Sequence, residues 1–224
     1  MIVYQKNYLK FASTYFFMDI LLDYFDDFTP IQQNQFKQLL PLYKEWNEKI
    51  NVVSRKDIDQ LYLHHVLHSL SIATFVQFSK ATKIIDIGCG GGFPGLPLAI
   101  FFPEASFLMV DSIGKKLKVI DAIAAEIGLT NITTKHCRVE EIKNQKFDFA
   151  ISRAVAPLSD LWRWSKPLLH QATKTNIANG LICLKGGDLH QEISDSKTRP
   201  KLMPINEIFN EDYFNEKFML YVER

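Results

Sequence analysis

The segment KIIDIGCGGGFPGLP, residues 83–97, decides the fold. It opens with a short apolar run of the kind that forms buried strands, and five of the ten glycines follow between Gly88 and Gly95. Glycines concentrated between a strand and a helix let the backbone turn sharply and approach a ligand closely. The segment therefore predicts a strand, a ligand-binding turn and a helix that begins near Gly95.

Beyond this turn, short β-rich runs alternate with helical stretches, a pattern typical of βαβ units in a mostly parallel sheet. We expect strands at Lys83–Ile87, Ser106–Asp111, Ile132–His136, Phe147–Ser152 and Gly180–Lys185, and helices at Gly95–Phe102, Lys115–Ile127 and Leu158–Leu169. The last two runs, Lys201–Ile205 and Lys217–Glu223, have no long helix between them, so we expect an antiparallel pair at a sheet edge. The pattern predicts an α/β protein.

A helical appendage is expected before the sheet. Apolar residues recur at helical spacing over Phe36–Ile50, and Pro41 should kink that helix or delay its start. Ser54 with Asp57 offers a cap for a second helix that continues to Ile72. We expect three parts: residues 1–29 as an N-terminal extension with a first helix, 30–80 as the appendage, and 81–224 as the ligand-binding domain.

Composition narrows the class of protein. A net charge of +1 gives no global field for holding a polyanion, so nucleic-acid binding needs a local basic patch. Three cysteines without paired spacing predict free thiols in a reducing compartment and no metal site. Asp19 and Asp23 interrupt the N-terminal apolar stretch, and no apolar run approaches the ~20 residues that span a bilayer. We expect a soluble, cytoplasmic protein without a membrane partner.

Two ligands compete for the glycine turn. Residues 90–95, GGGFPG, satisfy the dinucleotide pattern G-x-G-x-x-G, with Asp111 at about the right distance to hold a ribose. A pyrophosphate needs amides at the helix N-terminus, where Pro94 and Pro97 each remove one, and Asp86 would repel it. S-adenosylmethionine has no phosphate and carries an ammonium and a sulfonium, which attract a carboxylate. Asp86 therefore favours the methyl donor.

Further candidates follow the next two strands. Asp111 ends the second strand, where its carboxylate can meet the ribose hydroxyls; the competing role is a helix cap, and the two can coexist. After the third strand, Val139 and Glu140 lie where the adenine edge is expected. Taken alone, Glu140 is more typical of a solvated surface charge.

The reacting end of the site is expected after the fourth strand, in residues 152–157, SRAVAP. Arg153 can direct its forked guanidinium onto a carboxylate, a phosphate or a guanine edge; the alternative is an arginine on a surface loop. This slot has no Asp/Asn-Pro-Pro-Tyr/Phe segment, which argues against methylation of an exocyclic amine. It also has no Pro-Cys pair for covalent attack on a pyrimidine. The target atom should therefore need no strong activation.

Basic and aromatic side chains are the candidates for substrate contact: Lys115, Lys116, Lys118, Lys185, His64 and His65. The alternatives are a solvated helix face for the lysines and packing for the histidines. Trp162 and Trp164 cannot both face inward on one helix, so one is a candidate stacking platform. We expect docking through a local patch of Lys115, Lys116, Arg153 and Lys185, with salt-sensitive binding.

Taken together, these motifs resemble the family of bacterial ribosomal RNA small-subunit methyltransferase G, also called glucose-inhibited division protein B. The matching segments are Trp46–Ser54, His65–Ser69, Asp86–Pro97, Asp111–Lys116, Arg138–Glu141, Ile151–Ala156 and Leu184–Gly186. Coverage runs from about Phe36 to Val222. Residues 1–17 lie outside it, and we expect them to be an extension before the usual family start at Met18.

The resemblance implies methyl transfer from S-adenosylmethionine to N7 of a guanine in 16S ribosomal RNA. The implied fold is a Rossmann-like class I methyltransferase with a seven-stranded, mostly parallel sheet. We expect a monomer whose partner is 16S ribosomal RNA, the 30S subunit or an assembly intermediate. Gly88, Phe93, the Val139-Glu140 pair and Arg153 are implied to be cofactor contacts. The predicted cofactor site therefore comprises Asp86, Gly88, Gly90, Gly92, Phe93, Asp111, Val139, Glu140 and Arg153, and predicted RNA contacts are Lys115, Lys116, Lys185 and His65.

Two departures from the family pattern stand out: Cys89-Gly90-Gly91 replaces the Thr-Gly-Pro of many relatives, and His68 stands where others carry Asp. Guanine N7 has an in-plane lone pair, so no general base is expected, and Arg153 would act by positioning. Two other functions remain open at this point. One is a ribosome-associating or nucleic-acid-binding module that binds S-adenosylmethionine as a sensor, and the other is a small-molecule methyltransferase.

Overall fold

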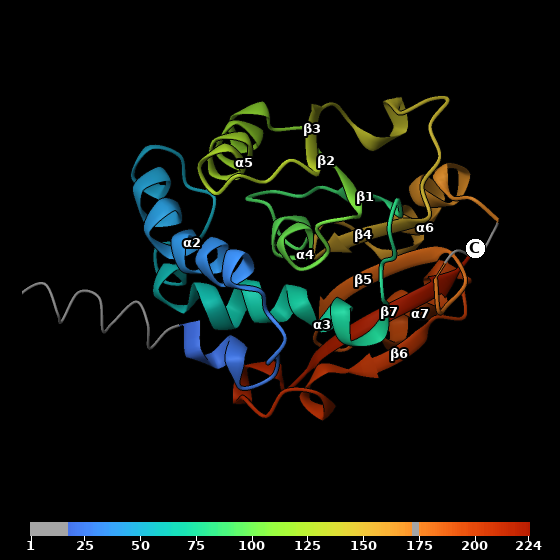
Figure 1. Cartoon of the computed structure of the whole chain (residues 1–224). Helices are drawn as coiled ribbons and strands as arrows, with labels where there is room; N and C mark the ends of the chain where they lie inside the picture. Colours follow the sequence, from blue (N-terminus) through green and yellow to red (C-terminus); the bar gives the residue numbers. More distant parts are fainter. Residues whose placement is uncertain (1–17, 172–174) are drawn as a thin grey trace, which may run out of the picture.

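A seven-stranded sheet forms the centre of the computed structural model, which describes residues 18–171 and 175–224 (Figure 1). The strand order is β3-β2-β1-β4-β5-β7-β6, and β7 alone runs antiparallel to its neighbours, β5 and β6. The strands are β1 Lys83–Ile87, β2 Ser106–Asp111, β3 Ile132–His136, β4 Phe149–Arg153, β5 Gly180–Gly186, β6 Lys201–Pro204 and β7 Lys217–Glu223. The predicted α/β fold and the antiparallel pair are confirmed.

Helices cover both faces of this sheet. The α-helices are α2 Pro30–Lys49, α3 His68–Phe75, α4 Gly95–Phe101, α5 Gly114–Glu126, α6 Leu158–Ser165 and α7 His190–Ser196. Along a strand, side chains alternate between the faces, so Ile84 packs with α2 to α5 whereas Ile85 packs with α6. The strand order reverses between β1 and β4, which opens a crevice at the carboxyl ends of these strands.

Helix α2 begins earlier than expected and runs through Pro41 without a break. Its start is a capping box: the Thr29 hydroxyl accepts the Gln32 N–H at 3.3 Å, and the Gln32 side chain accepts the Thr29 N–H at 2.9 Å. The expected delay at Pro41 was therefore wrong. The buried stripe of Phe36 and Tyr43 on this helix offsets the hydrogen bond that proline removes.

The second appendage helix is divided into three segments. The short turn η1 (Ile58–Gln60) and the wide π-type turn η2 (Leu61–Leu67) precede α3. The predicted cap by Asp57 was wrong, because its carboxylate makes no capping bond and contacts His64 and His65 instead. The segmented helix thereby brings two histidines to the carboxyl end of β4, where Arg153 lies.

The appendage and the sheet share one hydrophobic core. Phe36 and Leu39 of α2 lie in the same buried cluster as Ile84, Leu96 and Ile120. The division at residues 30 and 81 therefore remains a prediction about chain organisation, and the predicted extension at 1–17 lies outside the described residues. In the described part of the chain, no helix has both the length and the apolar character required for crossing a bilayer.

Candidate functional site

The glycine turn joins β1 to α4 at the carboxyl end of the sheet. Its first amides stay with the sheet, since the N–H groups of Gly88 and Cys89 both donate to Val110 O, at 2.8 and 3.1 Å. The Gly95 backbone packs against Asp86 with no room for a side chain, because a Cβ there would lie 2.6 Å from Asp86 Oδ2. A larger residue would displace the carboxylate on which the site is built.

Asp86 is fully buried at the end of β1. Its Oδ2 accepts the Gly95 N–H at 2.8 Å, while Oδ1 has no hydrogen-bond partner among the residues that the structure describes. Burial raises the pKa of this carboxyl to about 7, and the Gly95 bond and the charge of Arg153 oppose that rise. A buried acceptor without a donor is costly, so Asp86 is suited to receive a cationic or N–H group from a ligand.

Asp111 holds the glycine turn from the neighbouring strand. Its Oδ2 accepts the Gly90 N–H at 2.9 Å, and its Oδ1 accepts the Ile113 N–H at 2.8 Å. The second bond orders the loop before α5 and is not a cap on the helix itself, since α5 begins at Gly114. Each carboxylate oxygen retains an acceptor site for a further donor.

A cavity of about 200 Å³ lies at the carboxyl ends of β1 and β2. Predicted site residues Gly88, Asp111, Val139 and Glu140 line it together, with Val155 and Trp164 among the other walls. Val139 is buried and Glu140 is exposed on the short turn η3 (Val139–Glu141). Val155 covers Gly88 so closely that a Cβ on the glycine would lie 2.6 Å from its methyl carbon.

Phe93 and Arg153 lie in a second group, outside the lining of that cavity. The buried Phe93 ring stacks on Tyr43 with centroids 5.1 Å apart, and the Arg153 guanidinium lies 5.1 Å from the Phe93 centroid. Tyr43 in turn donates to Gly91 O at 2.6 Å, so its ring supports the glycine turn from below. Sequence reasoning treated Tyr43 only as part of the helical apolar pattern.

The Arg153 guanidinium is fixed by the helical appendage. It donates to His64 O at 3.1 Å and to His65 Nδ1 at 2.7 Å. Burial lowers the pKa of Arg153, while nearby Tyr213, Asp86, Tyr43 and Asp57 raise it. The arginine therefore joins the end of β4 to the appendage, which an arginine on a free surface loop would not do.

His65 is held between Asp57 and Arg153. Its Nε2 lies 2.5 Å from Asp57 Oδ2, so the ring carries its proton on Nε2 and offers the Nδ1 lone pair to the arginine. Burial lowers the pKa of His65 to about 4, with the Arg153 charge acting in the same direction. A neutral imidazole with both nitrogens occupied is a positioning group and not a proton acceptor.

Two further residues complete this cluster. Asp57 also contacts His64 Nδ1. Burial raises the pKa of the Asp57 carboxyl, but its bonds to the two histidines outweigh that effect and lower the pKa overall. Tyr213 stacks on His64 with centroids 3.9 Å apart and donates to His64 O at 3.2 Å. Sequence reasoning missed both roles, although the adjacent His64 and His65 were a usable signal.

The predicted basic patch does not form as a surface. Lys185 is buried, pairs with Glu192 at 2.7 Å and donates to Ala156 O, so the expectation that it contacts RNA does not fit its position. Arg153 is turned inward toward His65, as described. Of the expected patch, Lys115 is exposed and Lys116 half-buried on α5. Trp162 and Trp164 are both half-buried, so the predicted stacking platform stays a prediction.

Comparison with known proteins gives consistent matches. Residues 32–212 match the model of the family described as rRNA small subunit methyltransferase G. A ribosomal RNA small subunit methyltransferase G from Phocaeicola vulgatus is 52% identical over 205 residues, covering 92% of this chain and 98% of the relative. Another protein of that name, from Parabacteroides distasonis, is 48% identical over 218 residues, covering 97% of this chain and 94% of the relative.

The second alignment includes part of residues 1–17, so the resemblance reaches further toward the amino terminus than the motifs indicated. Among solved structures, the chain is similar to a mutant of MtNAS in complex with S-adenosylmethionine. The TM-score is 0.56 at 13% identity, over 86% of this chain and 76% of that one. At this identity the likeness establishes the fold alone.

Proposed function

The chain belongs to the rRNA small subunit methyltransferase G family, and from that membership we propose that it transfers a methyl group from S-adenosylmethionine to N7 of a guanine in 16S ribosomal RNA. The observation that carries the proposal is Asp86. Its buried Oδ1 has no hydrogen-bond partner in the described part of the chain and lies at the glycine turn, where an anionic dinucleotide would be repelled.

The residues present fit the cofactor. Asp86 suits its ammonium, Asp111 retains acceptor sites for the ribose hydroxyls, and the cavity beside Val139 and Glu140 suits the adenine. Gly88, Gly90 and Gly92, which all have positive φ, form the turn that passes closest to it. When bound, the cofactor supplies an electrophilic methyl group on a sulfonium. Val155 lies over Gly88 and would bound the cofactor on that side.

Arg153 is proposed to orient ligands at the reacting end. A guanidinium has five N–H donors, and the contacts with His64 and His65 use one N–H on each of its two terminal nitrogens, so three donors remain. These suit a carboxylate or the O6 and N7 edge of guanine. Phe93 supports the guanidinium from its face, which keeps the fork in one orientation.

The chemistry needs alignment more than proton transfer. Guanine N7 attacks through an in-plane lone pair and loses no proton, and His65 has no free nitrogen with which to accept one. The chain's contribution is to hold N7 in line with the methyl group and to exclude water from the reacting atoms. Asp86 adds a negative charge that favours positive charge moving onto the purine.

Labelled methyl transfer tests the proposal. Purified protein is incubated with S-adenosylmethionine and, in parallel, with unmodified 16S RNA, 30S particles lacking the modification, and small metabolites. We expect label on guanine N7 in an RNA-containing sample. Comparing the label in free 16S RNA with that in 30S particles identifies which of the two is the substrate. Label only in metabolites would support a small-molecule methyltransferase, and cofactor binding without transfer would support a sensor. We further propose that the protein acts as a monomer in the cytoplasm, where its ribosomal RNA substrate is found.

A further inference from the structure

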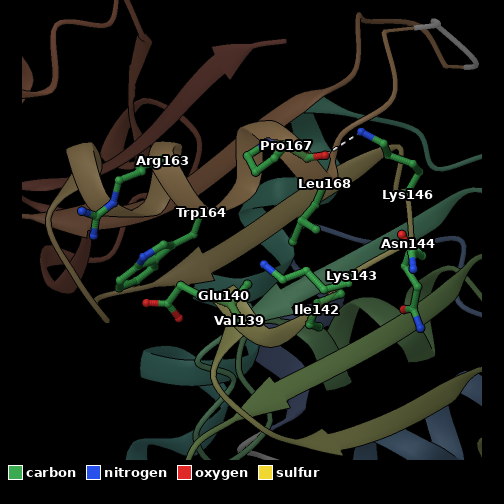
Figure 2. Close-up of a pocket in the computed structure, with 11 residues that line it drawn as sticks. Val139, Glu140, Ile142, Lys143, Asn144, Lys146, Arg163, Trp164, Pro167 and Leu168 are labelled. Atoms are coloured by element: carbon green, nitrogen blue, oxygen red, sulfur yellow. Dashed lines mark hydrogen bonds between the residues drawn. The ribbon is translucent and has the colours of Figure 1, made fainter.

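A second cavity, of about 750 Å³, adjoins the proposed cofactor cavity (Figure 2). It lies between η3, the loop that leads to β4, and the end of α6 with the turn η4 (Lys166–Leu168). The two cavities share Val139, Glu140 and Trp164 as walls. A ligand in the larger cavity would therefore lie next to the adenine end of a cofactor in the smaller one.

Positive side chains gather around this cavity. Lys143, Lys146 and Arg163 line it against one carboxylate, Glu140, which gives three positive charges minus one, or +2. Figure 2 shows Lys143 extending from the loop toward the middle of the space, while Lys146 donates to Pro167 O. The charge of the lining exceeds the net charge of +1 of the whole chain, so this is a local basic site of the kind that RNA binding requires.

Trp164 gives the cavity an aromatic wall with an unmet donor. Its ring reaches from α6 toward Glu140, and the indole Nε1–H is buried without a hydrogen-bond partner among the described residues. Buried N–H groups normally find an acceptor, so an orphan at a cavity wall indicates that a ligand supplies one. An indole face also provides a surface on which a nucleobase stacks.

We propose that this cavity binds an unpaired nucleotide of the RNA substrate. Lys143 and Lys146 would meet its phosphate, the Trp164 ring would stack on its base, and the Trp164 Nε1–H would donate to an oxygen of its sugar or phosphate. This inference rests on the proposed function, because it takes the substrate to be RNA. Stacking and phosphate contact together are how proteins hold single-stranded RNA without reading its sequence.

The test reverses charge at the cavity. The double variant Lys143→Glu, Lys146→Glu is compared with Lys197→Glu, Lys201→Glu, which makes the same change at the start of the edge strand β6, where both lysines are exposed and outside the cavity lining. We expect the cavity variant to raise KM for 16S RNA about tenfold and to make the salt dependence of RNA binding shallower by about two units of slope. The control and the affinity for S-adenosylmethionine should stay within about twofold of wild type.

Wild-type transfer is measured in the same series. Absence of any transfer to RNA or 30S particles refutes the proposed function, whereas transfer with the same KM in wild type and cavity variant overturns this inference alone. A loss of S-adenosylmethionine affinity in the cavity variant also overturns it, because the cavity would then serve the cofactor.

Fluorescence gives an independent readout. Replacing Trp46 and Trp162 with Phe leaves Trp164 as the one indole in the chain. At saturating S-adenosylhomocysteine, unmodified 16S RNA should quench its emission, and Lys143→Glu, Lys146→Glu in that background should shift the quench to about tenfold higher RNA concentration. Emission that does not respond to RNA, although the RNA binds, overturns the inference.

Discussion

His65 Nδ1 accepts a hydrogen bond from the Arg153 guanidinium across 2.7 Å. The imidazole belongs to the appendage and the arginine to the end of β4, so the contact joins two parts of the chain that are 88 residues apart. Asp57 holds the other side of the ring at 2.5 Å. The appendage thereby sets the direction of the one arginine expected at the reacting end.

Replacing His65 with alanine should lower kcat/KM for methyl transfer by about tenfold or more, because the guanidinium loses its acceptor and its orientation. His65→Asn should restore much of the loss, since an amide oxygen can accept from Arg153. The measurement is steady-state transfer to RNA, with His190→Ala on exposed α7 as the control. Equal activity in the alanine and asparagine variants would count against a positioning role.

Arg153→Ala should lower methyl transfer by about a hundredfold. Arg153→Lys should rescue little, because an ammonium lacks the planar fork. The alanine variant leaves His65 Nδ1 without its donor, while His64 O keeps the bond from Tyr213, so we expect a loss of about 1–3 kcal/mol in the free energy of unfolding with the fold retained. Exposed Arg199→Ala is the matched control, and near-normal turnover of Arg153→Ala would refute the site role.

The pKa of Asp86 predicts a pH dependence of cofactor binding. Its carboxyl is raised from 3.8 to about 7, so the folded state binds the proton more tightly than the unfolded chain. This group therefore lowers the free energy of unfolding as pH rises from about 4 to about 7. Binding of a cation needs the ionised form, so affinity should rise about tenfold from pH 6 to pH 8.

Calorimetry with S-adenosylmethionine measures this effect. In Asp86→Asn the affinity should be weaker, and the part of its pH dependence centred near 7 should disappear. An equally steep dependence in wild type and variant would assign the titration to another group. Asp111→Asn, which alters the neighbouring carboxylate, should keep the slope.

Gly95→Ala tests the close approach to Asp86. The new Cβ would lie 2.6 Å from Asp86 Oδ2 and 2.9 Å from the Met109 methyl carbon, so we expect a loss of about 1–3 kcal/mol in unfolding free energy together with weaker cofactor binding. Gly128→Ala is the control: a φ of +70° strains any added side chain, but the new Cβ would meet no described atom within 4 Å beyond its chain neighbours. It should reduce stability without affecting binding.

Much of the fold could be predicted from local patterns. Strands β1, β2 and β3 have the predicted bounds, because each is a short β-rich run between turn residues. Strand β4 begins two residues later than expected, at Phe149, because Phe147 forms only an isolated bridge with Leu169. Propensity along the chain cannot distinguish a bridge from a strand, since the pairing partner decides it.

The site was less predictable, because its contacts are long-range. Asp86, Asp111 and the glycines follow one another around the turn and could be placed by strand ends alone. Asp57 has the residue type and position of a helix cap, yet its carboxylate binds two imidazoles seven and eight residues later. No spacing rule reveals that Arg153 meets His65, since the contact depends on how the appendage packs on the sheet.

Substitution of Lys185 distinguishes a structural role for this buried lysine from the predicted contact with RNA. Its ammonium links Glu192 on α7 with Ala156 O in the loop after β4, and Glu192 also accepts the Leu158 N–H at 2.7 Å. Lys185→Met leaves a carboxylate without its cation, so we expect a loss of about 3 kcal/mol in the free energy of unfolding, measured by chemical denaturation. The salt slope of RNA binding should not change, because no phosphate contact is removed. A shallower slope with unchanged stability would restore Lys185 as an RNA contact, and the double variant Lys185→Met, Glu192→Gln should recover part of the lost stability.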